Sequence, residues 1–221
     1  MLNDALANIK NYFNMIPIDI GGSSYFKDSG MSFYINRYAV EGLGNLSTVS
    51  VRAILGIMKM DTLILTPYQK DLPLFSYDYI KAMGNHTMLT EFYDTVVDKG
   101  PEHSRLIDQL KVVKGEYSSL PDHDLGSHWY DYLKLEGSVS KRVKGKQSLE
   151  LDKLSAALLK EYLECSKNYP ELDNTQDKKL KTAEYVNGLF KNGGPSTDQF
   201  IKLLGRESAY ALFQEHIFGI K

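Results

Sequence analysis

The 221-residue chain is 43% hydrophobic and 24% charged, which is ordinary for a globular protein and excludes an intrinsically disordered one. Its formal net charge of -2 argues against a protein built mainly to coat nucleic acid. No apolar window reaches the length of a membrane span, and MLNDALANIKNYFNMI at the start lacks the features of a secretory signal. We therefore expect a cytoplasmic protein without a membrane or nucleic-acid partner.

The first predicted element is an amphipathic helix over residues 3–16. Apolar side chains recur there at helical spacing, at Leu6, Ile9, Phe13 and Ile16. Gly21 and Gly22 follow and break the pattern.

Five short segments rich in β-branched and aromatic residues come next and predict strands. They are 32–40, 46–58, 61–67, 73–83 and 87–97. The connections KMD, YQKD and GNH are too short for helical crossovers, so an antiparallel meander is expected.

The helical period returns from Ser104 and continues in three further helices after a loop and a polar stretch. These helices are predicted at about 149–166, 177–191 and 196–216, the last with a break at Gly205. A block of strands followed by a block of helices is typical of an α+β fold, with one sheet covered by helices. Without a repeat or a low-complexity linker, we expect a single domain over residues 1–221.

Two aspartates interrupt apolar strand patterns. In the strand 73–83, Asp78 shares a face with Leu74, Ser76 and Ile80, and Asp94 lies within the next predicted strand. A carboxylate buried without a cation has a raised pKa and can donate a proton near neutrality. The alternative is that each aspartate accepts hydrogen bonds from loop backbone at a strand end, and the pattern alone leaves both interpretations open.

Cysteine and histidine give little support for a metal site. The single cysteine, Cys165, excludes an internal disulfide and a cysteine cage. His123 and His128 lie in PDHDLGSHW, but their spacing fits no helical ligand pair, and a loop with Pro and Gly collects polar residues by default. We expect no bound metal.

The stretch SKRVKGKQ gathers Lys141, Arg142, Lys144 and Lys146. It is either a solvated loop or a patch that docks an acidic partner, since clustered charge raises encounter rates. No P-loop, nucleophile elbow, zinc-protease motif or dinucleotide fingerprint is present elsewhere.

Two longer stretches resemble the ferredoxin-dependent bilin reductase family, which includes the red chlorophyll catabolite reductases. LTPYQKDLPLFSYDYIKAMGNHTMLTEFYDTVVD (65–98) has a strand ending in Pro, a Leu-Pro-x-Phe frame and a hairpin between two Asp-bearing strands. AEYVNGLFKNGGPSTDQFIKLLGRESAYALFQEHIFGI (183–220) is similar to the family's closing helices. The order of elements agrees over roughly residues 30–220.

The resemblance implies an α/β/α sandwich, in which a central antiparallel sheet is flanked by helices and a linear tetrapyrrole binds between the sheet and the C-terminal helices. Members of the family reduce the tetrapyrrole by two one-electron transfers, each coupled to protonation. Reduced ferredoxin or flavodoxin is the external donor, and neither flavin nor metal is bound. The family's catalytic aspartate matches Asp78, which is therefore the expected proton donor.

The resemblance also implies a set of contacts around Asp78. Arg52 is expected to pair with a propionate, and Asp198 to act as a substitute second proton donor. The remaining expected substrate contacts are Thr62, Ser76, Asp94 and Asn192.

The chain departs from the family at its other acid and base positions. A family Glu and His on the two preceding strands are replaced by Ser50 or Arg52 and by Thr62 or Ile64, and the second Asp by Gly193. An alternative hypothesis is therefore a non-catalytic tetrapyrrole carrier or chaperone with the same fold. A third is an unrelated α+β protein in which Asp78 is structural.

Overall fold

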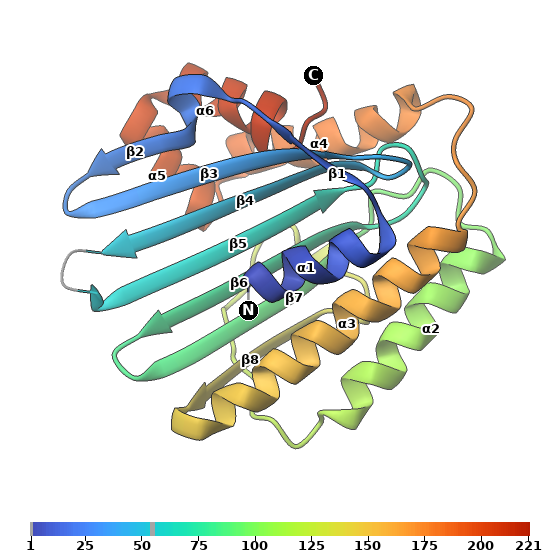
Figure 1. Ribbon diagram of the computed structural model, residues 1–221, viewed down its shortest axis with the longest axis horizontal. Coiled ribbons are helices and arrows are strands. Elements are labelled where there is room, and N and C mark those ends of the chain that lie inside the picture. Colours follow the sequence, from blue (N-terminus) through green and yellow to red (C-terminus); the bar gives the residue numbers. More distant parts are fainter. Residues whose placement is uncertain (1, 54–55) are drawn as a thin grey trace.

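In the computed structural model, which describes residues 2–53 and 56–221, one antiparallel sheet lies between two layers of helices (Figure 1). The strand order in the sheet is β1-β3-β4-β5-β6-β7-β8, and β2 pairs with β3 beside β1. The strands are β1 (Met15–Ile18), β2 (Tyr25–Asp28), β3 (Met31–Val40), β4 (Gly44–Ala53), β5 (Met58–Thr66), β6 (Leu74–Ala82), β7 (Asn85–Tyr93) and β8 (Val139–Lys144).

Each face of the sheet has its own helical layer, as Figure 1 shows. One layer consists of α1 (Leu2–Tyr12), α2 (Pro101–Glu116) and α3 (Ser148–Asn168). The other consists of α4 (Gln176–Asn192), α5 (Pro195–Leu204), α6 (Arg206–Leu212) and the short π-helix Phe213–Ile217 that follows α6. Short 3₁₀ turns are Gly21–Ser24, Asp131–Leu133 and Gly145–Gln147. The chain thus has the predicted α+β fold with the sandwich arrangement.

Strand alternation divides the core between the two layers. Phe75 and Tyr77 of β6 join the apolar cluster of α1, α2 and α3, where the Phe75 ring lies 5.4 Å from that of Tyr162. Leu74 points the other way and joins the cluster of α4, α5 and α6. Asp78 shares the face of Leu74 and is therefore directed toward the C-terminal helices.

The β6–β7 hairpin fixes which residues meet across the two strands. Its turn consists of Met83 and Gly84, with φ angles of 49° and 76°, and two left-handed residues are what a tight type I′ turn requires. The resulting register pairs Asp78 with Leu89 and Ser76 with Glu91.

The five predicted strands and five predicted helical segments are present, with shifted ends, and the last segment is divided into α5 and α6. The first helix stops at Tyr12 rather than continuing to residue 16, because Met15 already pairs with Val40 in β1. Gly205 separates α5 from α6 as expected, with a φ of 77°. In the predicted strand 46–58, Ile54 and Leu55 lie outside the described residues.

Three strands were not predicted. The strands β1 and β2 have four residues each, and β1 contains Pro17, so neither has a usable alternation pattern. The third, β8, falls in the stretch taken for a polar loop. Its Lys141 points inward and is only 4% exposed, an inward charge of the kind that protects edge strands from pairing with other chains.

A buried lysine joins α4 to the ends of β6 and β7. The side chain of Lys178 is 0% exposed, and its ammonium donates to Leu72 O at 2.5 Å and Thr95 O at 2.7 Å. Asp71 Oδ1 lies 3.4 Å away, and this carboxylate also accepts the backbone N–H groups of Val97 and Asp98. These buried polar groups are thus hydrogen-bonded or ion-paired to one another.

Within the part of the chain that the structure describes, no helix is both long and apolar enough to cross a membrane.

Candidate functional site

A cavity of about 260 Å³ lies between the sheet and the C-terminal helices. Its sheet wall carries the polar side chains of Thr62, Ser76, Asp78 and Glu91, and the opposite wall is largely apolar and aromatic. This size is near the lower end for small-molecule sites, and an apolar pocket with a few convergent polar groups is their usual form. A crevice on the other sheet face, against α1 and α3, holds about 50 Å³, which is room for water only.

Asp78 lies on β6, and its carboxylate is partly exposed to this cavity. Burial raises the pKa of Asp78 to about 6, a hydrogen bond from Thr62 opposes the rise, and the charge of Glu91 adds to it. Because the partner of the carboxylate is a strand threonine, the structure does not support the alternative that Asp78 caps loop backbone. A carboxyl group with this pKa can donate a proton near neutral pH.

The raised pKa of Asp78 predicts a pH-dependent stability. Its value of about 6 in the fold exceeds the ordinary 3.8, so the native state binds more protons than the unfolded state between about pH 4 and 6. The free energy of unfolding therefore falls as pH rises through that window. Asp78→Asn should be the more stable protein at pH 7.5, by at most about 3 kcal/mol, and this advantage should vanish toward pH 4. Urea unfolding across this range measures the difference, and identical curves for both proteins at pH 7.5 would contradict it.

Glu91 is a second carboxylate in the cavity, and the sequence interpretation missed it. It is 6% exposed, lies opposite Ser76, receives Lys134 Nζ at 2.7 Å and accepts the Tyr93 hydroxyl at 2.6 Å. The sequence could have predicted the position of Glu91. Strand alternation puts Glu91 on the same face as Leu89, and a two-residue hairpin turn places that face beside Asp78.

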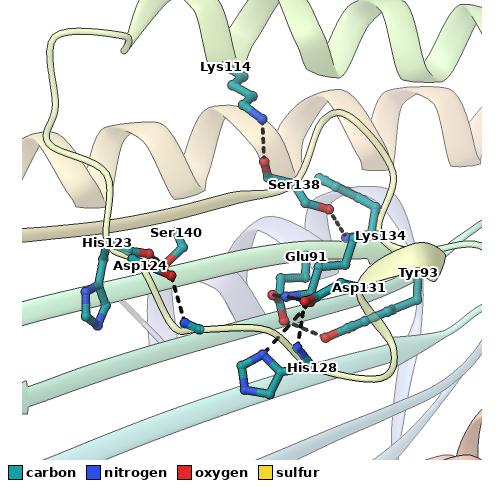
Figure 2. A network of polar contacts seen from close by, with 12 residues as sticks. Glu91, Tyr93, Lys114, His123, Asp124, His128, Asp131, Lys134, Ser138 and Ser140 are labelled. Atoms are coloured by element: carbon teal, nitrogen blue, oxygen red, sulfur yellow. Dashed lines mark hydrogen bonds and ion pairs between the residues drawn. The ribbon is translucent and has the colours of Figure 1, made fainter.

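The loop between α2 and β8 forms a further wall of the cavity through Leu125, His128 and Tyr130, and Figure 2 shows the polar contacts of this loop. The His128 ring stacks on Tyr130 with centroids 5.0 Å apart and planes 14° apart. Asp131 accepts the backbone N–H of His128 at 2.7 Å and lies 3.0 Å from Lys134 Nζ. Since Lys134 also binds Glu91, an ion-pair chain attaches the loop to the sheet.

Trp129 attaches the same loop to the helical side. Its indole N–H donates to Gly193 O at 2.8 Å, at the end of α4. Its ring packs so closely on Gly188 that an added Cβ would lie 2.1 Å from it. The loop is therefore held against both walls of the cavity.

The phenols of the cavity act as hydrogen-bond donors and not as bases. The rings of Tyr93 and Tyr185 lie 4.7 Å apart. Burial raises the pKa of both hydroxyls well above its ordinary value, and burial likewise raises the pKa of Tyr130 to about 12. All three remain protonated at physiological pH.

Of the predicted substrate contacts, Thr62 and Ser76 line the cavity with Asp78. Arg52, the expected partner of a propionate, does not line the cavity with them. Val49 pairs with Thr62 and shares the cavity face, so Arg52, an odd number of residues away, points to the opposite face. There Arg52 forms an ion pair with Asp61 at 2.5 Å.

Asp94, Asn192 and Asp198 are not part of the cavity lining. Asp94 follows the end of β7 and forms an ion pair with Lys99 at 2.5 Å. Asn192 is exposed at the end of α4, and Asp198 is exposed in the first turn of α5, where the buried neighbour Thr197 faces the cavity instead. This placement does not support Asp198 as the second proton donor.

The four basic residues of SKRVKGKQ do not form a surface patch together, because one of them is buried. Lys141 Nζ is buried, donating to Leu120 O at 2.7 Å and contacting Asp122 at 2.8 Å. Arg142, Lys144 and Lys146 are exposed. Among the described residues, no three His, Cys, Asp or Glu side chains come together as a metal site would need.

No protein-family model matches the sequence, and no curated protein is significantly similar to it. Among solved structures, the fold is similar to that of phytochromobilin synthase from tomato in complex with biliverdin, with a TM-score of 0.79. The alignment covers 99% of this chain and 82% of the synthase chain at 11% sequence identity. The two proteins share a fold.

Proposed function

We propose that the protein binds a linear tetrapyrrole in the cavity between the sheet and the C-terminal helices and reduces it there. The observation that carries the proposal is Asp78, a carboxyl group with a pKa of about 6 in a ligand-sized cavity. Support comes from a similar fold that has been solved with biliverdin.

The reaction adds two electrons and two protons to one double bond of the tetrapyrrole. Reduced ferredoxin or flavodoxin supplies the electrons one at a time from outside, so the chain itself needs no redox group. Asp78 donates a proton to the substrate and is reprotonated from water. Its neutral form also suits the pyrrole nitrogens, because a carboxyl group can both donate and accept a hydrogen bond.

The remaining walls serve binding and exclude water. Leu189 and Phe213 offer apolar surface to the flat conjugated rings, and Ser76 and Thr62 offer hydroxyls beside the acid. A bound tetrapyrrole displaces water from the cavity, which strengthens the electrostatic effect of Asp78 on a charged reduced substrate.

A substitution that fills the cavity tests where the tetrapyrrole binds. Ser76→Phe should weaken biliverdin binding by about tenfold or more, because its ring occupies space beside Asp78. Ser32→Phe is the matched control, since Ser32 lies in the same sheet but on the opposite face. Absorbance titrations measure both, and equal affinities for the two variants would place the ligand elsewhere.

A second candidate function is a tetrapyrrole carrier or chaperone that binds without reducing. It is favoured by the acid and base positions that differ from the family, with Gly193 in place of the second Asp and with Asp198 outside the cavity. A carrier would shift the absorbance of the bilin on mixing and leave it unreduced when an electron donor is added.

A further inference from the structure

The reduction needs two protons, and the sheet wall offers one group suited to supply them, Asp78. Glu91, the other sheet carboxylate in the cavity, is already engaged by Lys134 and Tyr93. A second donor on another wall removes the need to reprotonate Asp78 between the two transfers, and the loop between α2 and β8 contributes an imidazole there, His128.

His128 is fixed by several contacts of its own loop. Tyr130 stacks under its ring, and the backbone N–H is held by Asp131 Oδ2. Its Nδ1 is buried, lies 3.9 Å from Asp131 Oδ1 and has no hydrogen-bond partner among the described residues. A carboxylate beside one ring nitrogen orients a histidine ring and sets its tautomer, so Asp131 can hold His128 in the cavity wall.

A chain of ion pairs connects the loop of His128 to the sheet. Asp131 binds Lys134, and Lys134 binds Glu91 beside Ser76, so loop and sheet hold one another in place (Figure 2). Asp78 and His128 both line the cavity, and His128 stacks on Tyr130 of the same lining. The aspartate and the histidine thus belong to different walls of one cavity.

We propose that His128 is a second proton donor of this cavity, acting on the bound tetrapyrrole from the loop while Asp78 acts from the sheet, with Asp131 as its positioning residue. The inference rests on the proposed function. Imidazole is suited to the step because it is the side chain that ordinarily exchanges a proton near neutral pH.

The step balances with the proposed reaction. The external donor supplies two electrons, the Asp78 carboxyl gives one proton and becomes a carboxylate, and the His128 imidazolium gives the other and becomes a neutral imidazole. Water returns both protons. The charged and titratable groups around His128 that influence this exchange are Asp131, Lys134, Glu91, Tyr130 and Asp78.

The test compares His128→Gln with His123→Gln, a control on the same loop outside the cavity lining. We expect His128→Gln to bind biliverdin within about twofold of the parent and to reduce it about 10²-fold more slowly. His123→Gln should match the parent in both respects.

Asp131→Asn is the second variant. It keeps the His128 imidazole but removes the carboxylate charge beside Nδ1. It should slow turnover less than His128→Gln does and should lower kcat while KM stays within about twofold of the parent. Parental turnover in His128→Gln would overturn the role of His128 and leave the role of Asp78 standing. A parent that neither binds nor reduces the bilin would instead overturn the proposed function, and this inference with it.

Discussion

Asp78→Asn should bind biliverdin nearly as well as the parent but reduce it about 10²- to 10⁴-fold more slowly. An amide has almost the shape of the carboxyl group and can still accept the hydrogen bond from Thr62. It cannot deliver a proton to the substrate. Binding and turnover should therefore separate, which distinguishes a proton donor from a residue that only holds the ligand.

Single-turnover reduction under anaerobic conditions, with binding measured separately by absorbance, gives both quantities. Asp94→Asn is the matched control, because Asp94 is the aspartate on the neighbouring segment that lies outside the cavity lining. It should reduce biliverdin at nearly the parental rate. Parental turnover in Asp78→Asn, or an equal loss in Asp94→Asn, would contradict the assignment.

Lys178→Met should lower the free energy of unfolding by about 3–5 kcal/mol. The substitution leaves Asp71 buried without its cation and removes the donor to Leu72 O and Thr95 O. A buried carboxylate and two buried carbonyl oxygens without a donor lower the free energy of unfolding, because the methionine side chain cannot replace the ammonium group.

Urea unfolding followed by circular dichroism measures this loss. Lys181→Met is the control, since Lys181 lies on the same helix with its side chain 48% exposed, and its change should stay within about 0.5 kcal/mol. Adding Asp71→Asn to Lys178→Met should recover part of the stability, because the unpaired charge is then gone. A similar small loss for Lys178→Met and Lys181→Met would contradict a structural role for the buried ion pair.

The central sheet was predictable because its strands are short segments rich in β-branched and aromatic residues and their connections are short. The outer strands β1 and β8 were not predictable, for two physical reasons. β1 is short and contains Pro17, and β8 carries lysines on both faces, one of which finds its partners only in the folded protein. A side chain such as Lys141, held by Leu120 O and Asp122, has no local signature.

The candidate site was predictable where it depended on alternation within one strand. Asp78 and Ser76 of β6 do share a face and line the cavity together. Arg52 was misplaced because its direction depends on the pairing register of β4 with β5, which the sequence does not fix. The position of His128 depends on a loop attached through Trp129 and Lys134 to distant segments, so no periodic pattern could have placed it.

The most direct test of a bilin reductase is an anaerobic experiment with the parental protein. Biliverdin is added first, and reduced ferredoxin or flavodoxin second, while absorbance is recorded throughout. We predict a spectral shift on mixing, followed by loss of the biliverdin band as two electrons per bilin are consumed. A shift without reduction would contradict the enzymatic proposal in favour of a carrier, and the absence of any shift would contradict tetrapyrrole binding itself.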